Sequence, residues 1–198
     1  MAVDKAKFVE LLAALQSKDN EVRKKAETMY EQAKQTEPES TMVGFLTIGG
    51  STDVPDATRM QAAVLLRRQV LKGPDKDFTF PRVSHNGQQA VASELLRLFQ
   101  TEQNPKMQNK IGEVIASLAD YVCDEEDPRG TLAPGTCGWP ALLPMVFTMA
   151  DAGKTASAAS CESSMRLLKE LVSTLRNPIV AAKTELGVVL QNGLAHPD

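Results

Sequence analysis

The sequence is poor in cysteine and in aromatic side chains. Three cysteines, Cys123, Cys137 and Cys161, leave an odd count and form no paired disulfide framework, which suits a reducing compartment. Aromatic residues make up only 5% of the 198 residues, and runs of β-branched residues are few. Alanine, leucine, glutamate, lysine, glutamine and methionine are common instead, and these unbranched side chains lose little rotamer freedom in a helix. We therefore expect an all-α protein.

The sequence also lacks an excess of positive charge and a long hydrophobic run. Its 22 basic and 25 acidic residues give a net charge of −3, so no basic field favours nonspecific nucleic-acid binding. The longest nearly apolar stretch, 141–150, is far shorter than the roughly 18–20 residues that span a bilayer. The first five residues lack the charged and apolar regions of a signal peptide. We expect a soluble intracellular protein with no nucleic-acid partner and no membrane insertion.

The apolar residues that are present follow a helical period. The first stripe has the i, i+3, i+4, i+7 spacing of a helix with one buried face and consists of Phe8, Leu11, Leu12 and Leu15. A break at 17–20 contains the cap candidate Asp19. A second helix then follows, and its expected inner face consists of Val22, Ala26, Met29 and Ala33. Because only a few residues separate the two helices, they should pack antiparallel.

The same pairing recurs along the chain. A segment at 41–48 precedes a helix over 58–72, with Asp56 as its cap candidate. The third pair has the expected core residues Val91, Leu95, Leu98, Phe99, Met107, Ile111, Val114, Leu118 and Val122. The fourth pair has Leu142, Leu143, Val146, Phe147, Cys161, Met165, Leu168 and Val172. A ninth helix after 177–178 carries Val180, Leu186, Val189 and Leu190.

The second helices of these pairs align as a repeat. Their starts at 22, 58, 107 and 160 have an average spacing of about 46 residues, within the HEAT and armadillo period of about 40–47. The opening Asp-x-x-Val-Arg at 19–23 is typical of HEAT helices, with a cap, a buried aliphatic residue and a solvent-side arginine. We predict an α-α superhelix with repeats at 4–36, 38–72, 85–122 and 138–174 and an incomplete one at 177–198. Because a repeat cannot bury its apolar face alone, we expect an N-terminal segment of a longer protein.

Two segments could carry chemistry, and each has a plainer interpretation. The segment 148–155 is one residue short of a phosphate-binding loop, but Thr148 replaces the first glycine and the preceding segment is helical rather than extended. A turn between helices explains it better. Cys137 would need a general base to act as a nucleophile, and the two histidines, His85 and His196, lie in other repeats. A loop thiol beside a packing tryptophan, Trp139, is the better interpretation.

The acidic run 124–127 lacks the alternating spacing and the turn glycine of a calcium loop. Together with its prolines and glycines, the segment 123–140 is expected to be a solvated insertion. No catalytic site can be assembled from these residues, so we expect a protein that is not an enzyme and needs no cofactor. The basic residues Arg67 and Arg68 either sit favourably at the negative end of a helix or contact an acidic protein surface.

Four stretches resemble the N-terminus of the importin-beta-type nuclear transport receptors. They comprise 11–27, the Ala-Ala-Val-Leu-Leu-Arg-Arg segment with its preceding residues at 59–68, then 93–96 and 110–119. The similarity is good over about 5–122 and looser over 137–198. The segment 62–68 is the most specific part, and the rest is generic to HEAT repeats.

The resemblance implies a helical solenoid whose first repeats bind Ran in its GTP form through their second helices, which couples Ran binding to cargo release in the nucleus. Carried over by position, the expected Ran contacts are Glu27, Tyr30, Met60, Val64, Arg67, Arg68, Asn109, Lys110 and Glu113. Cargo proteins and nucleoporins are expected to bind mainly beyond this segment. The protein would shuttle between cytoplasm and nucleus.

Two features depart from the family pattern. The insertion 123–140 is longer than expected between such repeats, and the second helix near 160 lacks the arginine of the motif. Two other functions remain open on the sequence alone. One is a HEAT-repeat scaffold or regulatory subunit with different protein partners, which has the same folding physics. The other is a nucleotide-binding enzyme that would use residues 153–155.

Overall fold

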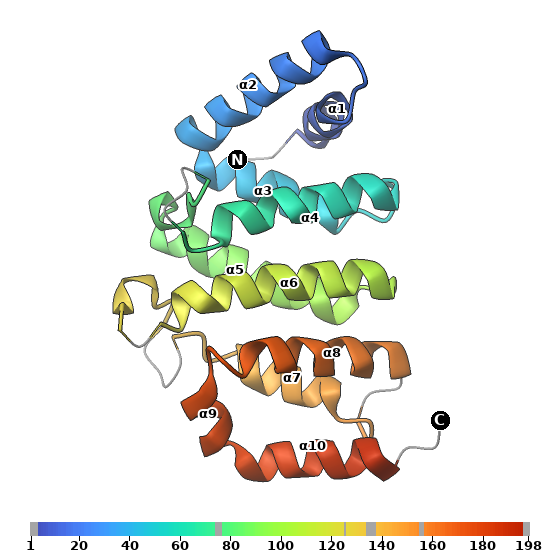
Figure 1. The fold of residues 1–198 in the computed structure, drawn as a ribbon, viewed down its shortest axis with the longest axis vertical. Coiled ribbons are helices and arrows are strands. Elements are labelled where there is room, and N and C mark those ends of the chain that lie inside the picture. The colour runs from blue at the N-terminus through green and yellow to red at the C-terminus, as the bar shows by residue number, and fades with distance from the viewer. Residues whose placement is uncertain (1–3, 74–76, 125, 134–137, 155–156, 196–198) are drawn as a thin grey trace. The chain divides into compact units, whose positions relative to one another are not determined.

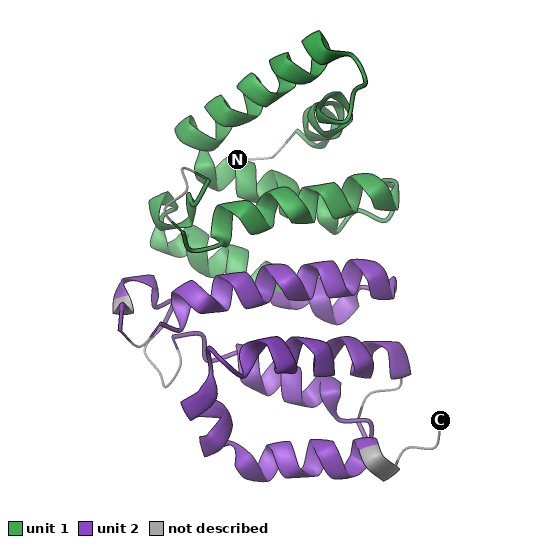
Figure 2. Ribbon diagram, in the orientation of Figure 1, with its two compact units in different colours: residues 1–95 green, residues 96–198 purple. Residues whose placement is uncertain are grey.

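A computed structural model describes residues 4–73, 77–124, 126–133, 138–154 and 157–195, and all regular structure in these residues is helical. Ten α-helices and two short 3-10 helices are present in the described part of the chain (Figure 1). The expected all-α class is confirmed. The chain divides into two compact units, residues 1–95 and 96–198 (Figure 2).

Unit 1 consists of helical pairs with a shared apolar core. Its elements are α1 (Lys5–Leu15), α2 (Asn20–Thr36), α3 (Pro38–Gly49), α4 (Asp56–Val70), the 3-10 helix η1 (Phe80–Arg82) and the first part of α5 (His85–Thr101). α3 packs along α4, and α1 contacts α2, α3 and α4. The Phe8 ring of α1 meets Phe45 of α3 edge-on, with centroids 5.6 Å apart, and lies against Gly44, where a Cβ would collide with it. The small residue lets the two helices approach closely.

The buried face of α2 differs from the expected one. Ala26, Tyr30 and Lys34 are buried at i, i+4 and i+8, whereas Val22 is 42% exposed and Met29 is 64% exposed. The expected inner face is therefore wrong at Val22 and Met29. A charged residue, Lys34, occupies an inward position, so a pattern based on hydrophobicity alone selects the wrong stripe.

The helix caps are confirmed in part. Asp19 Oδ1 accepts hydrogen bonds from the backbone N–H groups of Glu21 and Val22 at 2.8 and 3.3 Å, as expected for an N-cap. Asp56 is wrong as a cap, because α4 begins after Pro55 and has no side-chain cap. Asp56 instead pairs with Arg59, which is only 4% exposed and donates from Nε to the carbonyl of Gly49 at 2.9 Å. Arg59 thereby ties α4 to the end of α3.

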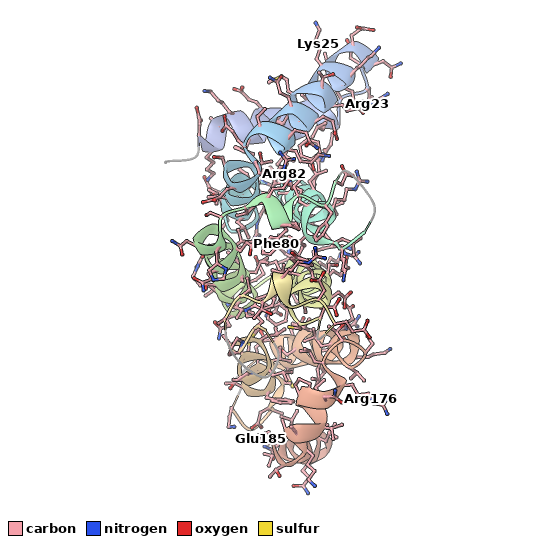
Figure 3. The ribbon with its side chains drawn as sticks, turned by 90° about the vertical axis from the view of Figure 1, so that its left-hand side faces the viewer. Arg23, Lys25, Phe80, Arg82, Arg176 and Glu185 are labelled. Carbon is pink, nitrogen blue, oxygen red and sulfur yellow. The ribbon has the colours of Figure 1, made fainter. Side chains whose placement is uncertain are left out.

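The segment between α4 and α5 is held against α2 and α3 by polar contacts. Asp77 accepts a hydrogen bond from the ammonium of Lys34. Arg82 donates to the side chain and to the carbonyl of Gln35, both at 2.5 Å. Figure 3 shows Arg82 on η1 together with Phe80, whose ring is fully buried. These contacts fix the path of the chain between the two helices.

Unit 2 continues the pattern of paired helices. It contains the end of α5, α6 (Pro105–Val122), the 3-10 helix η2 (Pro128–Gly130), α7 (Leu142–Ala150), α8 (Ala158–Leu171), α9 (Arg176–Ala181) and α10 (Lys183–Ala195). α6 lies beside α8, α7 packs along α8, and α10 contacts α7 (Figure 1). Asn104 caps α6: its Oδ1 accepts hydrogen bonds from the N–H groups of Lys106 and Met107, and Pro105 is the first helical residue.

The apolar stripe of α6 is buried as expected, but that of α8 is partly wrong. α8 buries Ser163, Ser164, Leu167, Leu168 and Leu171, whereas Val172 is 50% exposed. Two of these inward positions are thus occupied by small hydroxyl residues. One hydroxyl, that of Ser164, is satisfied within the helix by the carbonyl of Ser160 at 2.7 Å.

The segment 123–140 is not simply a solvated insertion. Leu132 and Trp139 are buried, at 3% and 4% exposure, so this segment contributes two apolar side chains to the core of unit 2. The expected packing tryptophan is confirmed. Gly138 has a φ of +66° and its carbonyl accepts from the N–H of Leu132 at 2.9 Å, so glycine is required at this turn. Cys137 lies outside the described residues.

The expected ninth helix is two helices. α9 ends at Ala181 and α10 begins at Lys183, with Ala182 as a non-helical link. Of the apolar residues expected on this helix, Val189 is buried and Leu186 half-buried, whereas Val180 and Leu190 are 64% and 45% exposed.

Candidate partner-binding surfaces

The most specific segment, 62–68, lies on α4 and is divided between core and surface. Ala62, Ala63, Leu65 and Leu66 are buried, whereas the exposed residues are Val64, Arg67 and Arg68. Both arginines lie in the last turn of α4, where positive charge is favoured by the helix dipole. Met60, one turn before Val64, is half-buried. The segment thus anchors α4 through its aliphatic residues and presents a short apolar and basic stripe.

The residues expected on α2 separate in the structure. Glu27 is exposed, but Tyr30 is only 6% exposed and packs against Phe45, with ring centroids 5.9 Å apart. Tyr30 therefore offers a partner little surface, because its ring belongs to the core of unit 1. Burial raises the pKa of Tyr30 to about 12. Met29, which the sequence pattern placed inside, is the large apolar side chain that α2 presents to solvent.

The three residues expected on α6 lie together in unit 2. Asn109, Lys110 and Glu113 are all half-buried. Lys110 Nζ donates to both carboxylate oxygens of Glu113, at 2.7 and 3.0 Å, within one turn of the helix. Asn109 Oδ1 is buried and has no hydrogen-bond partner in the described part of the protein. The three residues form a polar strip on α6.

This strip borders a small groove of about 90 Å³ between α6 and α8. Gly112 and Leu167 line it as small and apolar residues, and the polar lining residues are Asn109, Glu113, Ser163, Arg166 and Glu170. The sequence analysis did not select the residues on α8, because the start of this helix near 160 lacks the motif arginine present at Arg23 and Arg59. Their position beside α6 follows from helix packing, which no short motif encodes.

The segment resembling a phosphate loop is a turn after α7. The buried carboxylate of Asp151 accepts from the N–H of Gly153 at 3.0 Å and from Asn192 Nδ2 at 2.6 Å, and pairs with Lys154 at 3.1 Å. The pKa of Asp151 is lowered, chiefly by the Asn192 hydrogen bond. A bound phosphate would need the Lys154 ammonium and the N–H of Gly153, but the carboxylate of Asp151 already binds both groups. Thr155 lies outside the described residues.

Other candidate chemistry finds little support. No group of three or more histidine, cysteine or acidic side chains that could hold a metal occurs in the described residues. Cys161 donates from Sγ to the carbonyl of Ala150 at 3.0 Å, and burial together with the charge of Asp151 raises the pKa of its thiol. A raised pKa makes a thiol a poor nucleophile at neutral pH. Within the described ranges, none of the helices is long and apolar enough to cross a membrane.

A larger hollow of about 680 Å³ lies between α7, α9 and α10. Its lining is mostly apolar, including Leu143, Phe147 and Val188. Asp151, Lys154 and Glu185 are charged residues of its lining, and Figure 3 labels Glu185 on α10.

The chain has no match among protein-family models, but its fold is similar to that of solved karyopherins. A Kap121p mutant aligns with a TM-score of 0.68 and 20% identity over 95% of this chain. Kap121p bound to RanGTP aligns with a TM-score of 0.63 and 18% identity over 88%. Yeast importin-beta, Kap95p, aligns with a TM-score of 0.65 and 16% identity over the whole chain. The chain spans 16%, 15% and 28% of these proteins, respectively.

These alignments identify the fold as the helical-repeat fold of HEAT-type karyopherin solenoids. The expected fold class is therefore confirmed. The similar structures are transport receptors rather than enzymes, and some of them are complexes with Ran or with a nucleoporin.

Proposed function

We propose that this chain is a segment of an importin-beta-type nuclear transport receptor and binds Ran in its GTP form through α2, α4 and α6. Within that family, its sequence resembles importin five, also called karyopherin beta three. The observation that carries the proposal is that segment 62–68 has some side chains buried in the core and others exposed on the surface. Its aliphatic residues anchor α4, while Val64, Arg67 and Arg68 remain exposed on the helix that the family uses for Ran.

The fold supports this proposal, because Kap121p bound to RanGTP is among the similar structures. Exposed arginines steer a protein partner and add directional hydrogen bonds. On α2 the proposed contacts are Glu27 and the exposed Met29, and on α6 they are Asn109, Lys110 and Glu113. Cargo proteins and nucleoporins would bind mainly outside this segment, and the receptor would shuttle between cytoplasm and nucleus.

A titration of the 198-residue chain with Ran tests this function. Ran is loaded with a non-hydrolysable GTP analogue or with GDP, and the dissociation constant is measured by calorimetry. A preference for the GTP form is expected, because only differential affinity can couple nucleotide state to cargo release. Arg67→Glu/Arg68→Glu should weaken binding about tenfold or more, which corresponds to about 1.4 kcal/mol.

The matched control is Lys7→Glu/Lys183→Glu, which makes the same change in net charge at exposed positions on α1 and α10. It should bind Ran like the unmodified chain. Equal affinity for the two nucleotide forms would contradict the proposal. The second function, a HEAT scaffold with other protein partners, would then be favoured, because it has the same fold and predicts no dependence on the nucleotide.

A further inference from the structure

The groove between α6 and α8 has more hydrogen-bond acceptors than donors available to serve them. The cation of its lining, Arg166, and the neighbouring Lys110 are already engaged within their own helices. Lys110, beside the groove, donates to Glu113, and Arg166 donates from Nη2 to Glu162 at 2.6 Å. Each of these pairs joins residues three or four positions apart, which is the spacing at which helical side chains meet.

Two acceptors on opposite sides of the groove are left without a donor. Asn109 Oδ1 on α6 is buried and unpaired in the described structure. Glu170 on α8 is exposed, and none of the described residues donates to its carboxylate. A buried oxygen without a donor is costly, so such atoms in native proteins usually indicate a missing partner.

The geometry points to a basic side chain as that partner. We infer that the groove receives an arginine or lysine from the protein that binds α6 and α8, with Asn109 and Glu170 as its acceptors. A cation offers several N–H donors and no acceptor, which matches the unpaired oxygens. The lining charges are those of Glu113, Glu170 and Arg166, so the groove carries an excess of one negative charge.

The size of the groove fits one side chain rather than a larger ligand. A volume of about 90 Å³ is far below the roughly 300–1,000 Å³ of small-molecule sites. Gly112 contributes to this space, because a Cβ at that position would lie 3.3 Å from the Phe99 ring and 3.9 Å from Leu167 Cβ. The terminal torsion of an asparagine side chain is soft, so Asn109 can turn its amide oxygen toward an incoming donor.

The inference shares one assumption with the proposed function, namely that a protein partner binds α6. It adds α8 to the contact and specifies the chemistry of the incoming residue. Two measurements separate the failure of one proposal from the failure of the other.

The first measurement uses N-acetyl-arginine amide as the probe, without Ran. The side-chain amide resonances of Asn109 are followed by ¹H–¹⁵N NMR, with N-acetyl-glutamine amide as the neutral comparison. Arginine should shift the Asn109 signals and glutamine should not. Glu170→Gln should abolish the shift, whereas the control Glu185→Gln, the same change at an exposed position on α10, should retain it. Equal shifts with both probes, or none, overturn the inference.

The second measurement repeats the Ran titration with Glu170→Gln and Asn109→Leu. Each should weaken binding of the GTP form about threefold or more, since a hydrogen bond to a charged group contributes at least that much. Asn109→Asp should strengthen it, because a full charge replaces a dipole. Unchanged affinity in all three variants overturns the inference while leaving the proposed function in place. If the unmodified chain does not bind Ran but arginine still shifts Asn109, the proposed function fails and the basic-residue site stands.

Discussion

The ammonium of Lys34 on α2 donates a hydrogen bond to the carboxylate of Asp77, which lies 43 positions later in the chain. Lys34 is completely buried, whereas Asp77 is 27% exposed. Glu31 accepts a second hydrogen bond from the ammonium at 2.8 Å. Burial alone would lower the pKa of Lys34, but the hydrogen bonds to Asp77 and Glu31 outweigh it and raise the pKa. This pair connects α2 to the segment after α4.

Replacing Asp77 and replacing Lys34, each in a separate variant, should change the free energy of unfolding by different amounts. Asp77→Ala leaves a buried ammonium with only Glu31, and it should lower the free energy of unfolding by about 2–3 kcal/mol. Lys34→Met should cost about 1 kcal/mol or less, because both carboxylates can regain water and the stem of the side chain is retained. Urea denaturation measures both. Lys24→Met, at an exposed position on the same helix, is the control and should be neutral within about 0.5 kcal/mol. A larger loss from Lys34→Met than from Asp77→Ala would contradict this account.

From the raised pKa of Tyr30 we expect the protein to lose stability at alkaline pH. The folded protein keeps the Tyr30 proton up to a pKa of about 12, whereas an unfolded phenol releases it near 10. The stability from this group is therefore complete below pH 10 and is lost as pH rises from 10 to 12, by up to about 2–3 kcal/mol. The raised pKa of Lys34 acts in the same direction.

Urea denaturation between pH 8 and pH 11.5 checks this dependence, with Tyr30→Phe as the comparison. The variant should have a shallower decline above pH 10. It should lose little stability at pH 8, because the Tyr30 hydroxyl has no hydrogen-bond partner in the described residues. Parallel declines in the two proteins would show that Tyr30 does not titrate as described.

Much of the fold follows from sequence, because most helices carry one clear apolar stripe. The stripe predicted for α6 is buried at all five of its positions, Met107, Ile111, Val114, Leu118 and Val122. The sequence fails where an inward position is polar. Lys34 on α2 and Ser163 and Ser164 on α8 are buried through partners on other elements or in the helix backbone, so hydropathy assigns them to the wrong face.

The candidate surface is less predictable than the fold. The exposed arginines of α4 follow from a motif, but Tyr30 is buried and Met29 exposed, the reverse of the expectation. The two are successive residues that point about 100° apart around α2, so only one of them can face the core. The groove beside Asn109 combines residues from two helices that are about fifty positions apart, as in the Gln108–Ser160 contact, which is separated by 52 positions. Such a site depends on how the helices pack, and no local pattern contains that information.

The observed buried face of α2 leads to a direct prediction for two positions on this helix. Met29→Asp should change the free energy of unfolding by less than about 0.5 kcal/mol, because the side chain is 64% exposed. Ala26→Asp should lower it by at least about 2 kcal/mol, because it places a carboxylate at a position only 3% exposed. Thermal and urea unfolding followed by circular dichroism compare the two. If the expected inner face were correct, Met29→Asp would be strongly destabilising.

The environment of Cys161 predicts a slow reaction with electrophiles. Burial and the negative charge of Asp151 both raise the pKa of the thiol, which leaves less thiolate at a given pH. Alkylation of Cys161 by iodoacetamide at pH 8 should be about tenfold or more slower in the folded chain than in urea, as followed by peptide mass spectrometry. Asp151→Asn should accelerate it in the folded chain by removing a charge. Equal rates in folded and unfolded protein would contradict the assignment.

The contact between Asn192 and Asp151 predicts how α10 is attached to the end of α7. Asn192 Nδ2 donates to a carboxylate that is almost fully buried, and this bond is the chief reason why the pKa of Asp151 is lowered. The stability from Asp151 is therefore present above the ordinary carboxyl pKa and is lost as pH falls through the lower, folded value. Asn192→Ala should lower the melting temperature at pH 7 by about 2–6 °C, and by less at pH 3. Gln191→Ala, at the exposed neighbouring position, should leave it unchanged at both values. Because the bond stabilises the ionised carboxylate, an equal loss at pH 7 and pH 3 would mean that Asn192 acts through packing instead.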